Sequence, residues 1–188
     1  GKEGIDAVVV SDYGKGVITK RFMEKLMEFC RKNQKKIIVD PKPQNKEFYK
    51  GVTLITPNHK EACELGGETI TNNEDIIAVG KNISKELEAH ILITRGEKGM
   101  TLFEKGKEPV TIPTKAREVY DVTGAGDTVV ALMALAVSSG ATLQEAAELA
   151  NIAAGIVVGK VGTATVSAEE LREEIERQEG ESNGRGSN

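Results

Sequence analysis

Short apolar runs alternate with amphipathic segments along the first half of the chain, and this alternation restricts the fold more than any other feature. Four of the runs are rich in β-branched residues, as buried parallel strands are, and they lie at residues 5–11, 36–40, 52–56 and 90–94. Between the first two, Phe22, Leu26 and Phe29 recur at helical spacing. Strand–helix alternation predicts an α/β fold with helices on both faces of a mostly parallel, doubly wound sheet.

After residue 100 the pattern changes. Two short runs, 100–104 and 110–113, flank a charged turn and predict an antiparallel hairpin at one edge of the sheet. Helices are expected behind the N-cap Thr19, from Asn58 onward, and over residues 73–87, 125–139, 143–159 and 168–178. Residues 1–179 would then form one folded unit, and the Gly/Ser/Asn-rich residues 180–188 a disordered tail.

Composition excludes several classes of protein. The net charge is −4 and there is no tryptophan, so neither a basic face nor a stacking platform for nucleic acid is expected. The longest apolar run, residues 129–137, is too short to cross a bilayer, and no signal peptide opens the chain. Cys30 and Cys63 lack metal-ligand spacing. We therefore expect a cytoplasmic protein with neither nucleic acid nor membrane as partner, and the missing initiator Met suggests a fragment.

The most informative stretch is DVTGAGDT at residues 121–128, a glycine loop that leads into a predicted helix. Glycines allow close approach of a ligand, and the free N–H groups and positive dipole end of the helix would hold an anion such as a phosphate. An ordinary glycine turn, with Asp127 favoured in the first turn by the helix dipole, explains the same residues.

Three further places have a structural as well as a functional interpretation. Asn58 with Glu61 three residues later is a capping box as well as a candidate site. The segment TRGEKG at 94–99 reads either as a loop that ends a strand or as a loop that lines a ligand. Asn151 is either a polar residue on a helix surface or a contact to a ligand.

DVTGAGDT resembles the C-terminal signature of the ribokinase (PfkB) family of carbohydrate kinases. The resemblance implies a ribokinase-like fold, with Asp127 as catalytic base and an anion hole formed by the Gly124, Ala125 and Gly126 backbone. It also implies use of ATP and Mg²⁺, with Glu61 organising the metal through water. The implied ATP-binding residues are Asn58, His59, Lys60, Glu61, Thr94, Gly96, Lys98, Gly99 and Asn151.

Three more segments, SDYGKG at 11–16, VDPK at 39–42 and KVGTATVS at 160–167, resemble the branch of the family that phosphorylates D-glycero-β-D-manno-heptose 7-phosphate for ADP-heptose synthesis. Lys15 and Lys42 then either bind the anionic sugar phosphate or are solvated loop lysines. Family chains are longer at the N-terminus, where most sugar contacts lie, so this chain would be the ATP-side part. A kinase for ribose or fructose 1-phosphate, or a nucleotide-binding fragment without catalysis, stays open. A homodimer is a candidate assembly of the full-length parent.

Overall fold

A computed structural model describes residues 4–114, 121–162 and 164–184. Its centre is a six-stranded sheet in the order β1-β2-β3-β4-β5-β6. Four strands pair in parallel: β1 (Ala7–Ser11), β2 (Lys36–Asp40), β3 (Leu54–Ile55) and β4 (His90–Thr94). The last two, β5 (Met100–Phe103) and β6 (Val110–Ile112), add to β4 as an antiparallel hairpin. The mostly parallel sheet with an antiparallel edge hairpin is confirmed.

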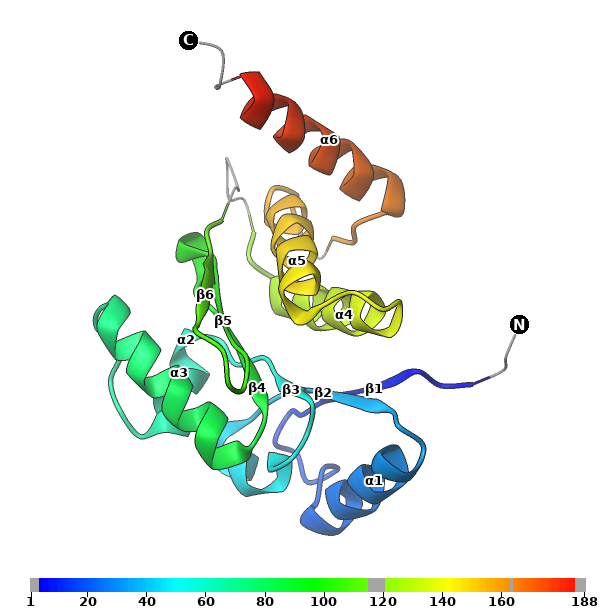
Figure 1. The fold of residues 1–188 in the computed structure, drawn as a ribbon, viewed down its shortest axis with the longest axis vertical. Coiled ribbons are helices and arrows are strands. Elements are labelled where there is room, and N and C mark those ends of the chain that lie inside the picture. The colour runs from blue at the N-terminus through cyan, green and yellow to red at the C-terminus, as the bar shows by residue number, and fades with distance from the viewer. Residues whose placement is uncertain (1–3, 115–120, 163, 185–188) are drawn as a thin grey trace.

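Helices cover both faces of the sheet (Figure 1). On one face lie α1 (Lys20–Lys32), a 3₁₀ segment η1 (Pro43–Tyr49), α2 (His59–Gly66) and α3 (Asn73–Leu87). On the other lie α4 (Ala125–Ser138) and α5 (Leu143–Val158), and α6 (Ala168–Gly184) packs against α5. Successive side chains of β2 point to opposite faces of the sheet, so they belong to two separate hydrophobic clusters. Ile37 and Val39 pack in the cluster under α1–α3, whereas Ile38 packs in the cluster under α4 and α5.

The strand order corrects the expectation of a doubly wound sheet. A doubly wound sheet reverses its strand order at a switch point. Here the strands follow one another in sequence order, so the helices between them gather on one face, and two consecutive helices from later in the chain cover the other. The alternation along the chain predicts parallel pairing, but it does not carry the order in which the strands pair.

The element bounds agree with the sequence to within two residues, except at the end of α6. Strand β3 has only two residues, because it pairs with its neighbours only at Leu54 and Ile55. Helix α6 continues past the expected end at Gln178 to Gly184. Residues 180–184, expected in a disordered tail, are helical in the structure. They include two glycines, Gly180 within the helix and Gly184 at its end, and a glycine within a helix costs only about 1 kcal/mol relative to alanine. Residues 185–188 lie outside the described residues.

The four parallel strands end at the same edge of the sheet, facing the start of α4. Asp12 follows β1, Asp40 ends β2, Thr56 follows β3 and Thr94 ends β4. All four line one cavity together with Asp127 from the first turn of α4. In open α/β sheets ligands bind outside the carboxyl ends of the strands. Among the described residues, no helix is both long and apolar enough to cross a membrane.

Candidate functional site

The glycine loop at 121–128 places a helix N-terminus at the cavity. Gly124 is the N-cap of α4 with φ +82°, a left-handed conformation that glycine adopts without strain, and a glycine has no side chain with which to cap the helix. Asp121 accepts a hydrogen bond from the Thr123 N–H at 2.9 Å, which holds the loop before the helix. The first-turn amides of a helix have no partner within it, so this end of α4 can receive an anion.

The amides of the predicted anion hole are not equivalent. The Ala125 N–H donates to the Val122 carbonyl at 3.3 Å, a long bond that closes the turn before the helix. Gly126 and Asp127 occupy the next two positions of the first turn, are exposed, and line the cavity. The Asp127 side chain therefore lies at the mouth of the helix N-terminus, where the sequence predicts a catalytic base.

A cavity of about 250 Å³ lies between the strand ends and α4. Its walls carry four carboxyl groups and one ammonium group among the described residues. The residues that line the cavity are Asp12, Tyr13, Asp40, Lys42, Thr56, Asn58, Glu61, Thr94, Gly124, Gly126 and Asp127. A cavity with this excess of carboxylates attracts cations, and it accepts a polyanion only together with one.

Glu61 is held from two sides. The capping box expected for α2 is present: the Glu61 carboxylate accepts from the Asn58 N–H at 3.0 Å, and the Asn58 side chain accepts from the Glu61 N–H at 2.9 Å. The other carboxylate oxygen accepts from the Lys42 ammonium at 2.7 Å. Glu61 is buried, at 8% exposure, and still lines the cavity. Helix capping and a role in the cavity are therefore compatible for this residue.

Asp12 is a buried member of the site to which the sequence analysis assigned no role. Its carboxylate accepts from the Tyr49 hydroxyl at 2.6 Å, the Asn45 side chain at 2.7 Å and the Gly14 N–H at 2.7 Å. Burial works against these donors, but together with Lys42 they hold the pKa of Asp12 below its usual value. The hydrogen-bonding capacity of Asp12 is largely used within the protein, so it braces the loop after β1 rather than offering a free carboxylate.

Asp40 lies in the opposite electrostatic situation. Burial raises the pKa of its carboxyl group to about 6, and the negative charges of Glu61 and Asp127 act in the same direction. Lys42 and a hydrogen bond from Ser11 only partly offset this. Sequence reasoning missed Asp40 as a site residue, although its position at the end of a predicted buried strand was a usable signal.

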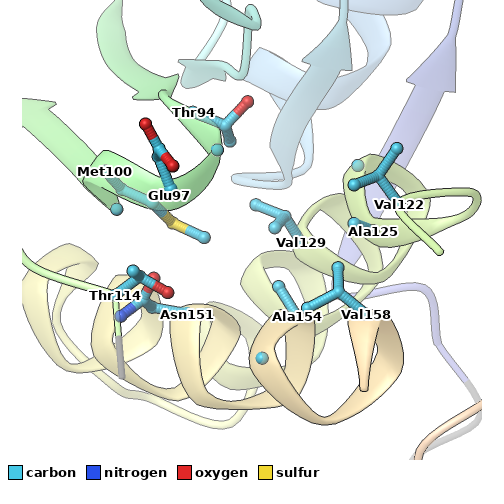
Figure 2. Close-up of a pocket in the computed structure, with 14 residues that line it drawn as sticks. Thr94, Glu97, Met100, Thr114, Val122, Ala125, Val129, Asn151, Ala154 and Val158 are labelled. Carbon is cyan, nitrogen blue, oxygen red and sulfur yellow. The ribbon is translucent and has the colours of Figure 1, made fainter. Parts of the chain in front are cut away.

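A larger cavity of about 430 Å³ adjoins the first, and Thr94 and Gly126 line both. Figure 2 shows its two walls: Thr94, Glu97 and Met100 on one side, and apolar side chains of α4, α5 and the loop before α4 on the other. Those apolar residues are Val122, Ala125, Val129, Ala154 and Val158. A mostly apolar cavity with few polar groups suits a flat organic ring.

Two predicted ATP-binding positions shape this larger cavity. Asn151 is buried, and its side-chain N–H₂ donates to the Pro113 carbonyl at 2.8 Å, which ties α5 to the end of β6. Gly99 has φ +77°, and a Cβ there would lie 2.0 Å from the Ile112 carbonyl oxygen. Glycine is thus required at this turn by the approach of β6 itself. Gly96 lines the same cavity.

Four predicted site residues lie elsewhere. Lys15, His59, Lys60 and Lys98 are exposed, and none lines either cavity. Lys60 turns along α2 to pair with Glu64 at 4.0 Å. Lys98 lies in a 3₁₀ turn whose glycines and Glu97, rather than its lysine, face the cavity. In the structure these lysines and the histidine are surface residues of the elements that carry the site.

The donor set allows Mg²⁺ only together with a ligand. Glu61, Asp40 and Asp127 offer hard carboxylate oxygens in one cavity, as Mg²⁺ prefers. In the described part of the chain no group of three or more His, Cys, Asp or Glu side chains is arranged to hold a metal ion. Mg²⁺ usually keeps several waters and binds through one or two carboxylates plus substrate phosphates, so the residues present fit a metal that arrives with a nucleotide.

Comparison with known proteins agrees with this geometry. Residues 3–171 match the family described as pfkB family carbohydrate kinase. The bifunctional protein HldE of Desulfatibacillum aliphaticivorans is 47% identical over 174 residues, which is 92% of this chain and 36% of that protein. HldE of Pseudomonas entomophila is 45% identical over 183 residues, 97% of this chain and 38% of that protein. The chain thus spans little more than a third of these relatives.

Solved structures share the fold. Arabidopsis thaliana ribokinase, complexed with ribose and ATP, aligns with a TM-score of 0.79 at 24% identity over 90% of this chain and 55% of that one. Escherichia coli phosphofructokinase-2, in complex with potassium, aligns with a TM-score of 0.77 at 19% identity over 89% of this chain and 55% of that one. At these identities the likeness establishes the fold, which is ribokinase-like as expected.

Proposed function

The chain belongs to the pfkB family of carbohydrate kinases, and from this premise we propose that it is the ATP-side part of a kinase for D-glycero-β-D-manno-heptose 7-phosphate. The reaction would convert this sugar phosphate to the 1,7-bisphosphate in the cytoplasm. Two HldE proteins at 45–47% identity support the assignment to this branch, as do the SDYGKG, VDPK and KVGTATVS segments. Dimerisation of a full-length parent stays a prediction.

The observation that carries the proposal is the junction of the two cavities at the N-terminus of α4. Thr94 and Gly126 line both. An adenine ring in the apolar cavity, against Val129 and Ala154, would direct its phosphates past this junction toward Asp127. The family's chemistry then follows from position, because phosphoryl transfer requires alignment and charge neutralisation more than covalent participation.

The sugar hydroxyl would reach the γ-phosphorus from the carboxyl-lined cavity. Its oxygen forms the new P–O bond while the bond to the β–γ bridging oxygen breaks and ADP leaves. Asp127 accepts the hydroxyl proton late in the transfer. The amides of Gly126 and Asp127 face the charge that develops on the phosphoryl oxygens, and oriented amides stabilise it without reorganising.

Mg²⁺ would be held by Glu61 through water, and it would offset charge on the β- and γ-phosphate oxygens. The Asn58 N–H keeps the Glu61 carboxylate in place from the other side. Lys42, the basic group that the described residues contribute to the cavity, would contact a phosphate. For Lys15, Lys98 and Lys60 the structure offers no comparable argument, because all three lie outside the cavities.

Two assays test the proposal. The first is kinase activity of a hybrid protein in which this chain replaces the matched segment of the Desulfatibacillum aliphaticivorans relative, with ribose and fructose 1-phosphate as alternative acceptors. We expect phosphorylation of heptose 7-phosphate above either alternative. The second is a melting curve of the 188-residue chain with and without ATP. ATP should raise the melting temperature, while the chain alone should phosphorylate sugar weakly or not at all. A folded hybrid without kinase activity would refute the proposal, and ATP binding in such a hybrid would favour a nucleotide-binding module.

A further inference from the structure

Lys42 is the only basic side chain among the described residues that line the smaller cavity, where it faces four carboxyl groups. Its ammonium lies 2.7 Å from one oxygen of Glu61. A lysine ammonium is charged at neutral pH, and the Asp40 and Asp12 carboxyl groups line the same cavity. The cavity therefore contains its own counter-ion in the absence of any ligand.

The main chain of Lys42 is fixed while its side chain is accessible. Tyr49 accepts a hydrogen bond from the Lys42 N–H at 3.0 Å, and its hydroxyl also lies 3.3 Å from the Lys42 carbonyl oxygen. Tyr49 is itself fully buried and donates to Asp12. These hydrogen bonds fix the backbone position of Lys42, so the ammonium can move only by rotation about the side-chain bonds.

The two partners of the ion pair differ in freedom. The Glu61 side chain is 11% exposed and its second oxygen is held by the Asn58 N–H, whereas the Lys42 side chain is 37% exposed. If a second cation binds the same carboxylate oxygen, the lysine is the partner that can leave. A lysine side chain is long and has several rotatable bonds, and it can reorient within the cavity without disturbing the backbone.

We propose that Lys42 is an exchangeable counter-ion. Its ammonium pairs with the Glu61 carboxylate when the site has no divalent cation. When a divalent cation binds at Glu61, the ammonium moves to a phosphate oxygen in the same cavity. The inference rests on the proposed phosphate-transfer function and adds a coupling to it. A divalent cation held at the same carboxylate through water repels the ammonium that lies against it. A phosphate that enters with the metal supplies the charge that the displaced ammonium requires.

The exchange is tested with the 188-residue chain and no sugar. Mg²⁺ affinity is measured by thermal shift at constant ionic strength, with ADP present at saturating concentration to carry the metal, for wild type, Lys42→Met, Glu61→Gln and the double variant. Removal of the competing ammonium should tighten Mg²⁺ binding about fivefold, equivalent to an ion pair of roughly 1 kcal/mol. In the Glu61→Gln background, Lys42→Met should have no effect. The matched control is Lys46→Met, which also removes one Lys–Glu pair, with Glu86 at 2.7 Å, but outside both cavities.

The outcomes separate the exchange from a general effect of charge. Tighter Mg²⁺ binding that persists in the Glu61→Gln background, or that appears equally in Lys46→Met, would overturn the exchange. So would unchanged Mg²⁺ binding in a folded Lys42→Met variant. Because this titration involves neither sugar nor turnover, its result is independent of whether heptose 7-phosphate is the substrate.

Phosphate probes test the second half of the inference and identify the source of the phosphate. With Mg²⁺ present, Lys42→Met should weaken binding of a non-hydrolysable ATP analogue about tenfold and leave ADP unchanged if the γ-phosphate is the partner. A loss confined to a sugar phosphate, measured in the hybrid protein, would assign the lysine to the acceptor instead. If Lys42→Met binds the ATP analogue, ADP and the sugar phosphate each as tightly as wild type does, the transfer to phosphate is refuted.

Discussion

The raised pKa of Asp40 predicts that Asp40→Asn stabilises the protein at neutral pH. Burial is the main cause of the shift, and the carboxylates of Glu61 and Asp127 add to it. Asparagine keeps the shape of the side chain and cannot ionise, so it removes the cost of holding a charge at this position. The substitution should therefore increase the free energy of unfolding wherever wild-type Asp40 is ionised.

The direction with pH follows from the folded-state pKa, about 6, against an ordinary value of 3.8. The folded protein binds this proton more tightly than the unfolded chain does. The contribution of Asp40 to stability is therefore greatest below pH 3.8, falls as pH rises toward 6, and is constant above that. The shift corresponds to at most about 3 kcal/mol. Because the side chain is only partly buried, solvent screening reduces the expected gain to about 1–2 kcal/mol.

Urea unfolding of wild type and Asp40→Asn between pH 4.5 and pH 8 measures this gain. The difference in unfolding free energy should reach its full value above pH 7 and shrink toward pH 4.5. Asp6→Asn, which removes an exposed carboxylate near the start of β1, serves as the control for net charge. A difference that is independent of pH, or a variant less stable than wild type at pH 8, would refute the electrostatic account of the cavity.

Three further predictions concern metal, backbone and nucleotide. Glu61→Gln should keep the capping box, because glutamine also serves in capping boxes. It should raise the Mg²⁺ concentration that gives a half-maximal kinase rate in the hybrid protein. A lowered melting temperature with unchanged Mg²⁺ dependence would give Asn58 and Glu61 a structural role only. Gly99→Ala should cost about 3 kcal/mol or more in urea unfolding, since strain at φ +77° adds to the clash with Ile112. Gly106→Ala, at φ +78° with nothing within 4 Å, should cost only about 1 kcal/mol, and equal losses would refute the clash. Ala154→Phe should weaken ATP binding of the chain at least about tenfold by filling the larger cavity, measured by calorimetry, and unchanged affinity would move the adenine elsewhere.

The sequence predicted the bounds of a helix or strand well where a single local pattern, such as a β-branched run or a helix cap, marks it. The bounds of β2, β4 and α3 agree with expectation, because continuous β-branched runs and strong capping residues mark them. The 3₁₀ segment η1 was not predicted, since the seven residues Pro43–Tyr49, interrupted by a non-helical conformation at Asn45, are too short to show a periodicity. It nevertheless supplies Asn45 and Tyr49, which bind Asp12.

The site was predictable only in part for a related reason. The glycine loop at 121–128 and the capping box of Asn58 and Glu61 are local patterns, and both lie at the cavity. The pairing of Lys42 with Glu61 joins residues 19 positions apart and depends on strand order. The apolar wall draws on Val129 and Val158 from two helices, and nothing in either helix alone distinguishes these residues from core.

The central claim is that Asp127 removes the proton from the sugar hydroxyl at the N-terminus of α4. The most direct test is Asp127→Asn in the hybrid protein, with kinase turnover and ATP affinity measured on the same preparation. Loss of a general base predicts a fall in turnover of at least about 100-fold, with ATP affinity close to wild type because the apolar cavity and the backbone amides are unchanged. Turnover near the wild-type rate in the asparagine variant would contradict the claim.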